Sequence, residues 1–246
     1  IYSFTIDTSV TVSTWFQTTQ SQFDTDTLSG AVSLATNTIT VATSASNGLA
    51  AYAEGTIQTP RYRLWSGTSW GSELSALSVG ATINWVVLRP GETRDEYILG
   101  TLGTDGDINM QVYKNGAWGN AQEITSTAAD AGARGFDIAY ENASGDAIAV
   151  ACDGDADPVY WTWNGTGWTN SGTINLASAN NCAWIKLIAD PASDEMIVIS
   201  RDTAGSQYEA QVWNATSSTW GNSITLGSML EVSHEGMAGA YEESSN

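Results

Sequence analysis

The chain has 246 residues, of which 42% are hydrophobic and 10% aromatic, which excludes a disordered chain and suffices for a buried core. Its 27 acidic residues against 8 lysines and arginines give a net charge of −19, which excludes nucleic acid as a partner because phosphates are bound by clustered Lys and Arg. No run of 18 apolar residues occurs, so we expect no membrane-spanning segment in this stretch.

The first predicted element is a strand at residues 1–13, where apolar side chains alternate with polar ones and shift once. With the polar connection that follows, it makes up a segment, residues 1–34, that precedes the repeats. We expect this strand either to pair with an open sheet edge of another subunit, giving a filament-forming contact, or to close a sheet of its own chain. The predicted contact residues are Tyr2, Phe4, Ile6, Val10 and Val12.

From about residue 35, one unit repeats. Each copy contains a turn that ends on a tryptophan, and these closing tryptophans, Trp70, Trp118, Trp168 and Trp220, are 48 to 52 residues apart. This spacing is typical of solenoids, propellers and arrays. The predicted units are residues 35–70, 71–118, 119–168 and 169–220, followed by a partial unit at 221–246. Residues 240–246 resemble residues 139–145, so we expect the array to stop within a unit.

Each full unit reads as four short strands. In the third unit and its continuation, strands are predicted at 135–141, 147–152, 159–163 and 168–176. Middle strands such as 147–152 are apolar on both sides, which is typical of a sheet covered on both faces. A lone four-stranded sheet cannot bury both faces, whereas blades stacked around an axis can. The sequence therefore predicts an all-β, β-propeller-like array of four-stranded blades.

The turns between third and fourth strands resemble degenerate Asp boxes of sialidase-like propellers. The resemblance rests on the Gly and Trp positions, and Ser or Asn replaces the Asp: Gly67 and Trp70, Gly116 and Trp118, Gly165 and Trp168. Trp-anchored blade repeats of bacterial and archaeal surface proteins are equally similar. The resemblance implies secreted or cell-surface propellers and carries over no function. A sialidase needs three arginines around a carboxylate, and the turn positions of Arg89 and Arg94 argue against such a cluster.

The two cysteines, Cys152 and Cys182, allow two interpretations. They are either buried thiols or a single disulfide, which an extracellular location permits and which joins consecutive units. The Ser-, Thr-, Asn- and Gly-rich composition indicates an exported protein, at the cell surface or beyond it. The start at Ile1 without Met predicts a removed leader or anchor.

Asp153, Asp155 and Asp157 have the alternate spacing of calcium ligands, and calcium is the one cofactor that the sequence suggests. The alternative is an Asp-Gly hairpin turn, which the similar residues 105–107 favour. Three N-glycosylation sequons fall on predicted turns, at Asn142, Asn164 and Asn214.

No motif indicates catalysis. His234 is the only histidine, so any triad has to use it, and its flanks show no nucleophile motif. Tryptophans near the turns either pack between blades or stack on sugar rings, and their repetition favours packing. The sequence predicts a non-enzymatic extracellular structural or adhesive protein that self-associates in a cell-surface or filamentous assembly. The alternatives are a monomeric glycan-binding propeller and a glycan-processing, sialidase-like hydrolase.

Overall fold

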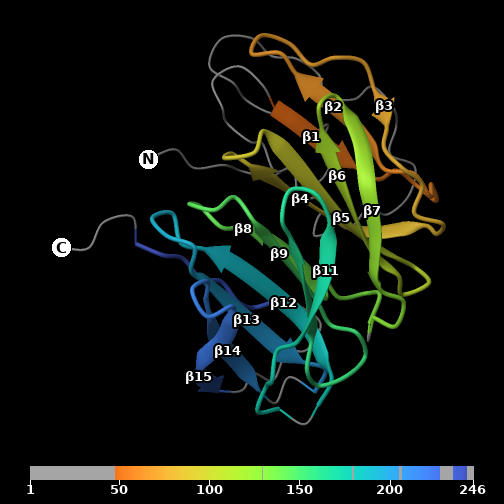
Figure 1. Ribbon diagram of the computed structural model, residues 1–246. Coiled ribbons are helices and arrows are strands. Elements are labelled where there is room, and N and C mark those ends of the chain that lie inside the picture. The colour runs from red at the N-terminus through yellow and green to blue at the C-terminus, as the bar shows by residue number, and fades with distance from the viewer. Residues whose placement is uncertain (1–47, 129, 179, 205–206, 228–234, 243–246) are drawn as a thin grey trace, which may run out of the picture.

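The computed structural model describes residues 48–128, 130–178, 180–204, 207–227 and 235–242, and every element within these ranges is a strand (Figure 1). The predicted contact residues Tyr2, Phe4, Ile6, Val10 and Val12 lie outside the described residues. Among the described residues, no helix has the length and apolar character needed to cross a membrane.

The strands form four antiparallel sheets in which chain neighbours pair, named sheets 1 to 4 in chain order. Sheet 1 contains β1 (Gly48–Tyr52), β2 (Arg61–Trp65) and β3 (Leu74–Ser75). Sheet 2 contains β4 (Ile83–Gly91), β5 (Glu96–Gly103), β6 (Ile108–Lys114) and β7 (Ala117–Thr125). Sheet 3 contains β8 (Phe136–Tyr140), β9 (Ala147–Ala151), β10 (Val159–Trp163) and β11 (Trp168–Thr173). Sheet 4 contains β12 (Cys182–Ala189), β13 (Met196–Asp202), β14 (Tyr208–Asn214) and β15 (Thr219–Gly227).

Every sheet has one aromatic pair across the turn between its last two strands. The ring centroids are 5.2 to 5.3 Å apart in all four pairs: Trp65 and Trp70, Tyr113 and Trp118, Trp163 and Trp168, Trp213 and Trp220. The closing tryptophan therefore belongs to the same sheet as the aromatic residue before the turn. Sheets 2 to 4 each end after a fourth strand, whereas the predicted units end at the closing tryptophan.

The middle strand β9 shows how the sheets stack. Ala147, Ala149 and Ala151 lie in the core shared with sheet 2, and Ile148 and Val150 lie in the core shared with sheet 4. A third core joins sheets 1 and 2. Figure 1 shows the sheets in succession, from the orange sheet 1 to the blue sheet 4. The all-β, propeller-like stack of blades is confirmed, and the central sheet is covered on both faces.

A disulfide joins sheet 3 to sheet 4. Cys152 directly follows β9, Cys182 begins β12, and their Cα atoms are 5.1 Å apart. The sequence leaves open whether the two cysteines are buried thiols or a disulfide, and the structure contains the disulfide.

Candidate functional site

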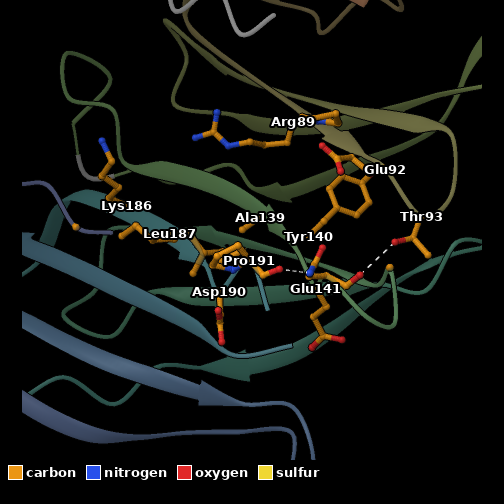
Figure 2. Close-up of a pocket in the computed structure, with 16 residues that line it drawn as sticks. Arg89, Glu92, Thr93, Ala139, Tyr140, Glu141, Lys186, Leu187, Asp190 and Pro191 are labelled. Atoms are coloured by element: carbon orange, nitrogen blue, oxygen red, sulfur yellow. Dashed lines mark hydrogen bonds between the residues drawn. The ribbon is translucent and has the colours of Figure 1, made fainter. Parts of the chain in front are cut away.

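A cavity of about 590 Å³, here called the first-strand pocket, lies where the first strands of sheets 2, 3 and 4 end. Each first strand is a sheet edge that pairs only with the second strand of its own sheet. The pocket wall comes from the ends of the first strands and the turns that follow, including Arg89, Glu92, Thr93, Tyr140, Glu141, Lys186, Leu187, Asp190 and Pro191 (Figure 2).

Tyr140 stands at the centre of this wall and has a fixed position. Its ring lies on Gly91, where an added Cβ would come 2.5 Å from the Cε1 atom of Tyr140. Its hydroxyl donates to Oε1 of Glu96 at 3.3 Å. Burial, and next the charge of Glu96, raise the pKa of Tyr140. The side chain is therefore a neutral phenol that donates a hydrogen bond, and it is poorly suited to act as a nucleophile.

Two carboxylates, one behind the pocket wall and one within it, accept hydrogen bonds from tryptophans of the neighbouring sheet. Glu96 is 1% exposed and accepts the indole N–H of Trp163 at 2.7 Å, while Lys114 lies 3.1 Å from its other oxygen. Glu141 accepts the indole N–H of Trp213 at 2.8 Å. These tryptophans are buried and hydrogen-bonded inside the junctions. They therefore pack between blades, as their repetition suggests, and do not face a ligand.

Of the two cations that line the pocket, Arg89 is held in the wall. Its guanidinium donates to the Ile138 carbonyl at 3.0 Å and to Asp137 at 2.8 Å. Lys186 is one-third exposed, and its Nζ atom is 3.6 Å from Oε1 of Glu235. Lys186 is therefore the pocket cation more accessible to a ligand.

The acceptors of the pocket lie opposite Lys186 in the view of Figure 2 and below it. Glu92 is exposed, and the hydroxyl of Thr93 donates to the Asn142 carbonyl at 3.2 Å. Hydrogen bonds from Ser193 and from the Ala192 N–H lower the pKa of Asp190, so this group stays ionised. The pocket therefore offers carboxylate, hydroxyl and ammonium groups together with apolar surface.

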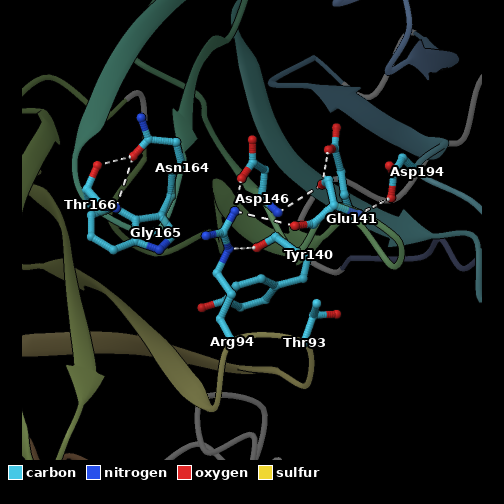
Figure 3. Close-up of polar contacts among 12 residues, drawn as sticks. Thr93, Arg94, Tyr140, Glu141, Asp146, Asn164, Gly165, Thr166 and Asp194 are labelled. Carbon is cyan, nitrogen blue, oxygen red and sulfur yellow. Dashed lines mark hydrogen bonds and ion pairs between the residues drawn. The ribbon is translucent and has the colours of Figure 1, made fainter.

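The turns around the mouth are joined from sheet to sheet. Arg94 donates to the Gly145 carbonyl at 2.6 Å and pairs with Asp146, which connects sheet 2 to sheet 3 (Figure 3). Asp194 accepts the backbone N–H groups of Ala143 at 2.6 Å and Ser144 at 3.1 Å, which connects sheet 3 to sheet 4. These bonds fix the rim of the pocket across three sheets.

The three sequon asparagines are all exposed and differ in the hydrogen bonds of their side-chain amides. The side-chain nitrogen of Asn142 donates to the Pro191 carbonyl within the rim. Asn164 and Asn214 are exposed, and their side-chain oxygens accept backbone N–H groups of their own turns. The side-chain nitrogens of the latter two take no part in these turn bonds.

The three aspartates of the predicted calcium site do not converge. Oδ1 of Asp153 accepts the N–H of Asp155 at 3.4 Å, and Oδ1 of Asp157 accepts the N–H of Leu176 at 2.8 Å. Nowhere in the described ranges are three or more His, Cys, Asp or Glu side chains arranged to hold a metal ion. The aspartates therefore serve the turn and its neighbouring connection, which agrees with the hairpin alternative.

Every arginine of the chain has a partner within the described residues. Arg89 and Arg94 are bound as given above, and Arg134 donates to Glu235 at 2.5 Å. The others have these partners: Glu73 for Arg61, the Gly71 carbonyl for Arg63 and the Trp184 ring for Arg201. The described residues thus offer no open cluster of three arginines for a carboxylate ligand. The one histidine of the sequence, His234, lies outside the described residues.

No protein-family model matches the chain, and no curated protein matches its sequence. AofleA from Arthrobotrys oligospora is similar in structure, with 15% identity and a TM-score of 0.48 over 75% of this chain and 55% of that one. A fungal lectin from Aleuria aurantia, described as a six-bladed β-propeller with a novel fucose recognition mode, has 15% identity and a TM-score of 0.45 over 74% and 58%.

The intramolecular trans-sialidase from Ruminococcus gnavus has 11% identity and a TM-score of 0.42, over 63% of this chain and 36% of that one. The chain thus spans little more than half the length of the two proteins named before it. At such identities and TM-scores, we draw nothing about ligands or activity from these likenesses.

Proposed function

We propose that this chain is a non-catalytic carbohydrate-binding module whose sugar site is the first-strand pocket. The observation that carries the proposal is the chemistry of that 590 Å³ pocket, in which Lys186, Thr93, Glu92 and Asp190 surround apolar surface. Sugar hydroxyls both donate and accept hydrogen bonds, and their C–H faces pack on apolar groups. A small number of polar groups on an apolar wall is the usual form of a small-molecule site.

The same pocket offers little support for a hydrolase. Tyr140 is kept neutral and hydrogen-bonded, and Glu141 is occupied by Trp213 and by Ser144, whose hydroxyl lies 2.5 Å away. General acid and base catalysis needs a carboxyl that is free to exchange a proton with a substrate. The fixed partners of these groups favour binding without turnover.

A glycan array probed with the full chain tests this proposal. We expect the best ligand to lose affinity at least about tenfold in Glu92→Ala and in Lys186→Met, because each removes a hydrogen-bonding group. Glu123→Ala is the matched control, since Glu123 is an exposed acid in β7 outside the pocket. Equal binding by all variants, or no bound glycan at all, contradicts the proposal.

We also propose that the protein is secreted and carries N-linked sugars at Asn164 and Asn214. Expression through a secretory pathway that N-glycosylates is expected to load Asn164 and Asn214, whose side-chain nitrogens take no part in their turn bonds, and to leave Asn142 bare, because its side-chain nitrogen donates to the Pro191 carbonyl. Intact-mass analysis of Asn142→Gln, Asn164→Gln and Asn214→Gln checks this. A mass loss confined to Asn142→Gln contradicts it. Self-association through the N-terminal strand stays a prediction.

A further inference from the structure

One position, in the fourth strand or directly after it, is buried in two sheets and exposed in a third. Ile124, Ile174 and Leu226 each follow the closing tryptophan of their sheet by six residues. Ile124 is 6% exposed and lies in the core shared with sheet 3, and Ile174 is 0% exposed in the core shared with sheet 4. Leu226 is 53% exposed, and Ile224 beside it is 55% exposed. The equivalent face of sheet 4 is therefore left uncovered by the described residues.

Residues 235–242 lie against this sheet where a first strand is expected. Gly236, Ala240 and Tyr241 repeat Gly135, Ala139 and Tyr140 of the β8 region at the same spacing. A Cβ at Gly239, two residues before Tyr241, would lie 2.9 Å from Cδ1 of Ile199 in β13.

The junction of sheets 2 and 3 contains a similar contact between a glycine and an isoleucine, but there the glycine is in the second strand and the isoleucine in the first. There the glycine is Gly100, in the second strand, and a Cβ on it would lie 3.0 Å from Cδ1 of Ile138, two residues before Tyr140. A glycine thus faces an isoleucine in both places. This complementarity indicates that residues 235–242 occupy the place of a first strand on sheet 4.

The carboxylate and the tyrosine of the junction recur as well. Glu195 precedes β13 and pairs with Asp190 across the turn, as Glu96 at the start of β5 pairs with Gly91. Burial, and next the charges of Glu195 and Asp190, raise the pKa of Tyr241 to about 12. Glu96 additionally receives an indole N–H from the third strand of the next sheet. Among the hydrogen bonds of the described residues, Glu195 receives none from an indole.

We propose that the exposed face of sheet 4 is a docking surface for a further four-stranded blade of the same repeat. Residues 235–242 form the first strand of that blade, its apolar strands cover Leu226 and Ile224, and a tryptophan of its third strand donates to Glu195. Gly239 also lines the first-strand pocket, so the same blade borders that pocket. This interface stands independently of the proposed sugar binding.

The repeat itself supplies a test partner. Asn246 aligns with Gly145, so a copy of residues 146–176 appended after Asn246 continues the repeat in register and brings β9, β10, β11 and Trp163. The copied Cys152 is changed to Ala. Because the described residues contain no free cysteine, Leu226→Cys provides a single reactive thiol on the face. We expect the appended strands to slow its alkylation at least about tenfold, as burial does for thiols.

Two matched variants make the result specific. Thr225→Cys places the thiol at the position that the exposed Glu123 has in β7, next to the buried Ile124, and its alkylation is expected to stay unchanged. Trp163→Leu in the appended copy removes the indole donor, and part of the protection at Leu226→Cys is expected to be lost. Equal alkylation with and without the appended strands overturns the proposal, whether or not those strands fold.

The chain without the appended strands gives the remaining outcomes. Rapid alkylation of Leu226→Cys at all protein concentrations supports an open docking face. Slow alkylation that appears only at high concentration assigns the face to a second copy of the chain. Slow alkylation at every dilution assigns it to another segment of the same chain. Either of these last two results overturns the proposal.

Discussion

The two inner junctions, between sheets 2 and 3 and between sheets 3 and 4, share one type of contact and differ in the other bonds that join the sheets. Both place an indole of the later sheet on a carboxylate of the earlier one, with N–H to oxygen distances of 2.7 and 2.8 Å. The first junction adds the hydrogen bond from Lys114 to the Gly165 carbonyl, at 3.3 Å, and the ion pair of Arg94 with Asp146. The second adds the disulfide and the Asp194 contacts. The repeat therefore fixes the position of the sheets, and individual side chains determine how strongly each junction holds.

The shared element is the indole on the carboxylate, and its removal is expected to have the largest effect. Trp163 and Trp213 are both buried, so Trp163→Ala and Trp213→Ala should each cost about 3–5 kcal/mol of unfolding free energy. Denaturant titration by tryptophan fluorescence and circular dichroism measures this. A cost below about 1 kcal/mol in either variant contradicts a shared role for the two indoles. Thr169→Ala, an exposed change in β11, is the control.

The disulfide distinguishes the second junction from the first. Replacing both cysteines in Cys152→Ala/Cys182→Ala should cost about 3–4 kcal/mol, because the bridge closes a loop of 30 residues in the unfolded chain. Adding reductant to the parent chain should lower its melting temperature similarly and leave the double variant unchanged. The disulfide assignment fails if the parent chain melts identically with and without reductant and free thiols are detected in it.

The strands were predictable because each bears a local signal. β10 has the predicted bounds, and β9 differs only by ending one residue earlier, since apolar runs end at turn residues there. β4 runs on to Gly91 although a turn is predicted from Arg89, because Pro90 and Gly91 still pair with β5. Local sequence shows where a strand can begin, and cross-strand pairing decides where it ends.

The pocket was not predictable in this way. Tyr140, Glu92 and Lys186 stand about 50 residues apart in chain order and meet only because three first strands converge. The predicted calcium residues show the same limit of local sequence: the spacing of Asp153 and Asp157 is local, whereas the Leu176 N–H that Asp157 accepts comes from beyond the next two strands. The one available signal was the acidic residue that directly follows each first strand of sheets 2 to 4, at Glu92, Glu141 and Asp190, because all three line the pocket.

Removing the ion pair of Arg94 with Asp146 tests how much the first junction depends on its partly exposed salt bridge. Arg94 and Asp146 are partly exposed, so Arg94→Ala should cost no more than about 1 kcal/mol. Arg94→Lys should recover little of this, because Arg94 donates to both the Gly145 carbonyl and Asp146, and an ammonium does not reproduce that fork. Thermal melts at low and high salt measure the difference. A cost equal to that of Trp163→Ala shows instead that the rim carries the junction.

The smallest expected effect on stability comes from Asp153, which follows Cys152 at the second junction. Burial, and then the charges of Asp155 and Asp157, raise the pKa of Asp153, although backbone hydrogen bonds oppose the shift. The folded state therefore prefers the protonated group. Its contribution to stability is complete below the unfolded-state pKa of about 3.9 and is lost as pH rises through the folded value.

Asp153→Asn should accordingly stabilise the chain at neutral pH, by about 0.5 kcal/mol or less, and the gain should vanish in acid. Asparagine keeps the oxygen that accepts the Asp155 N–H, so the turn itself is retained. Asp107→Asn, in the corresponding turn of sheet 2, should behave likewise, because burial and then Asp105 and Glu123 raise the pKa of Asp107. Melting curves across pH decide the sign. A loss of stability at neutral pH in both variants means that the carboxylates form bonds that their amides cannot replace.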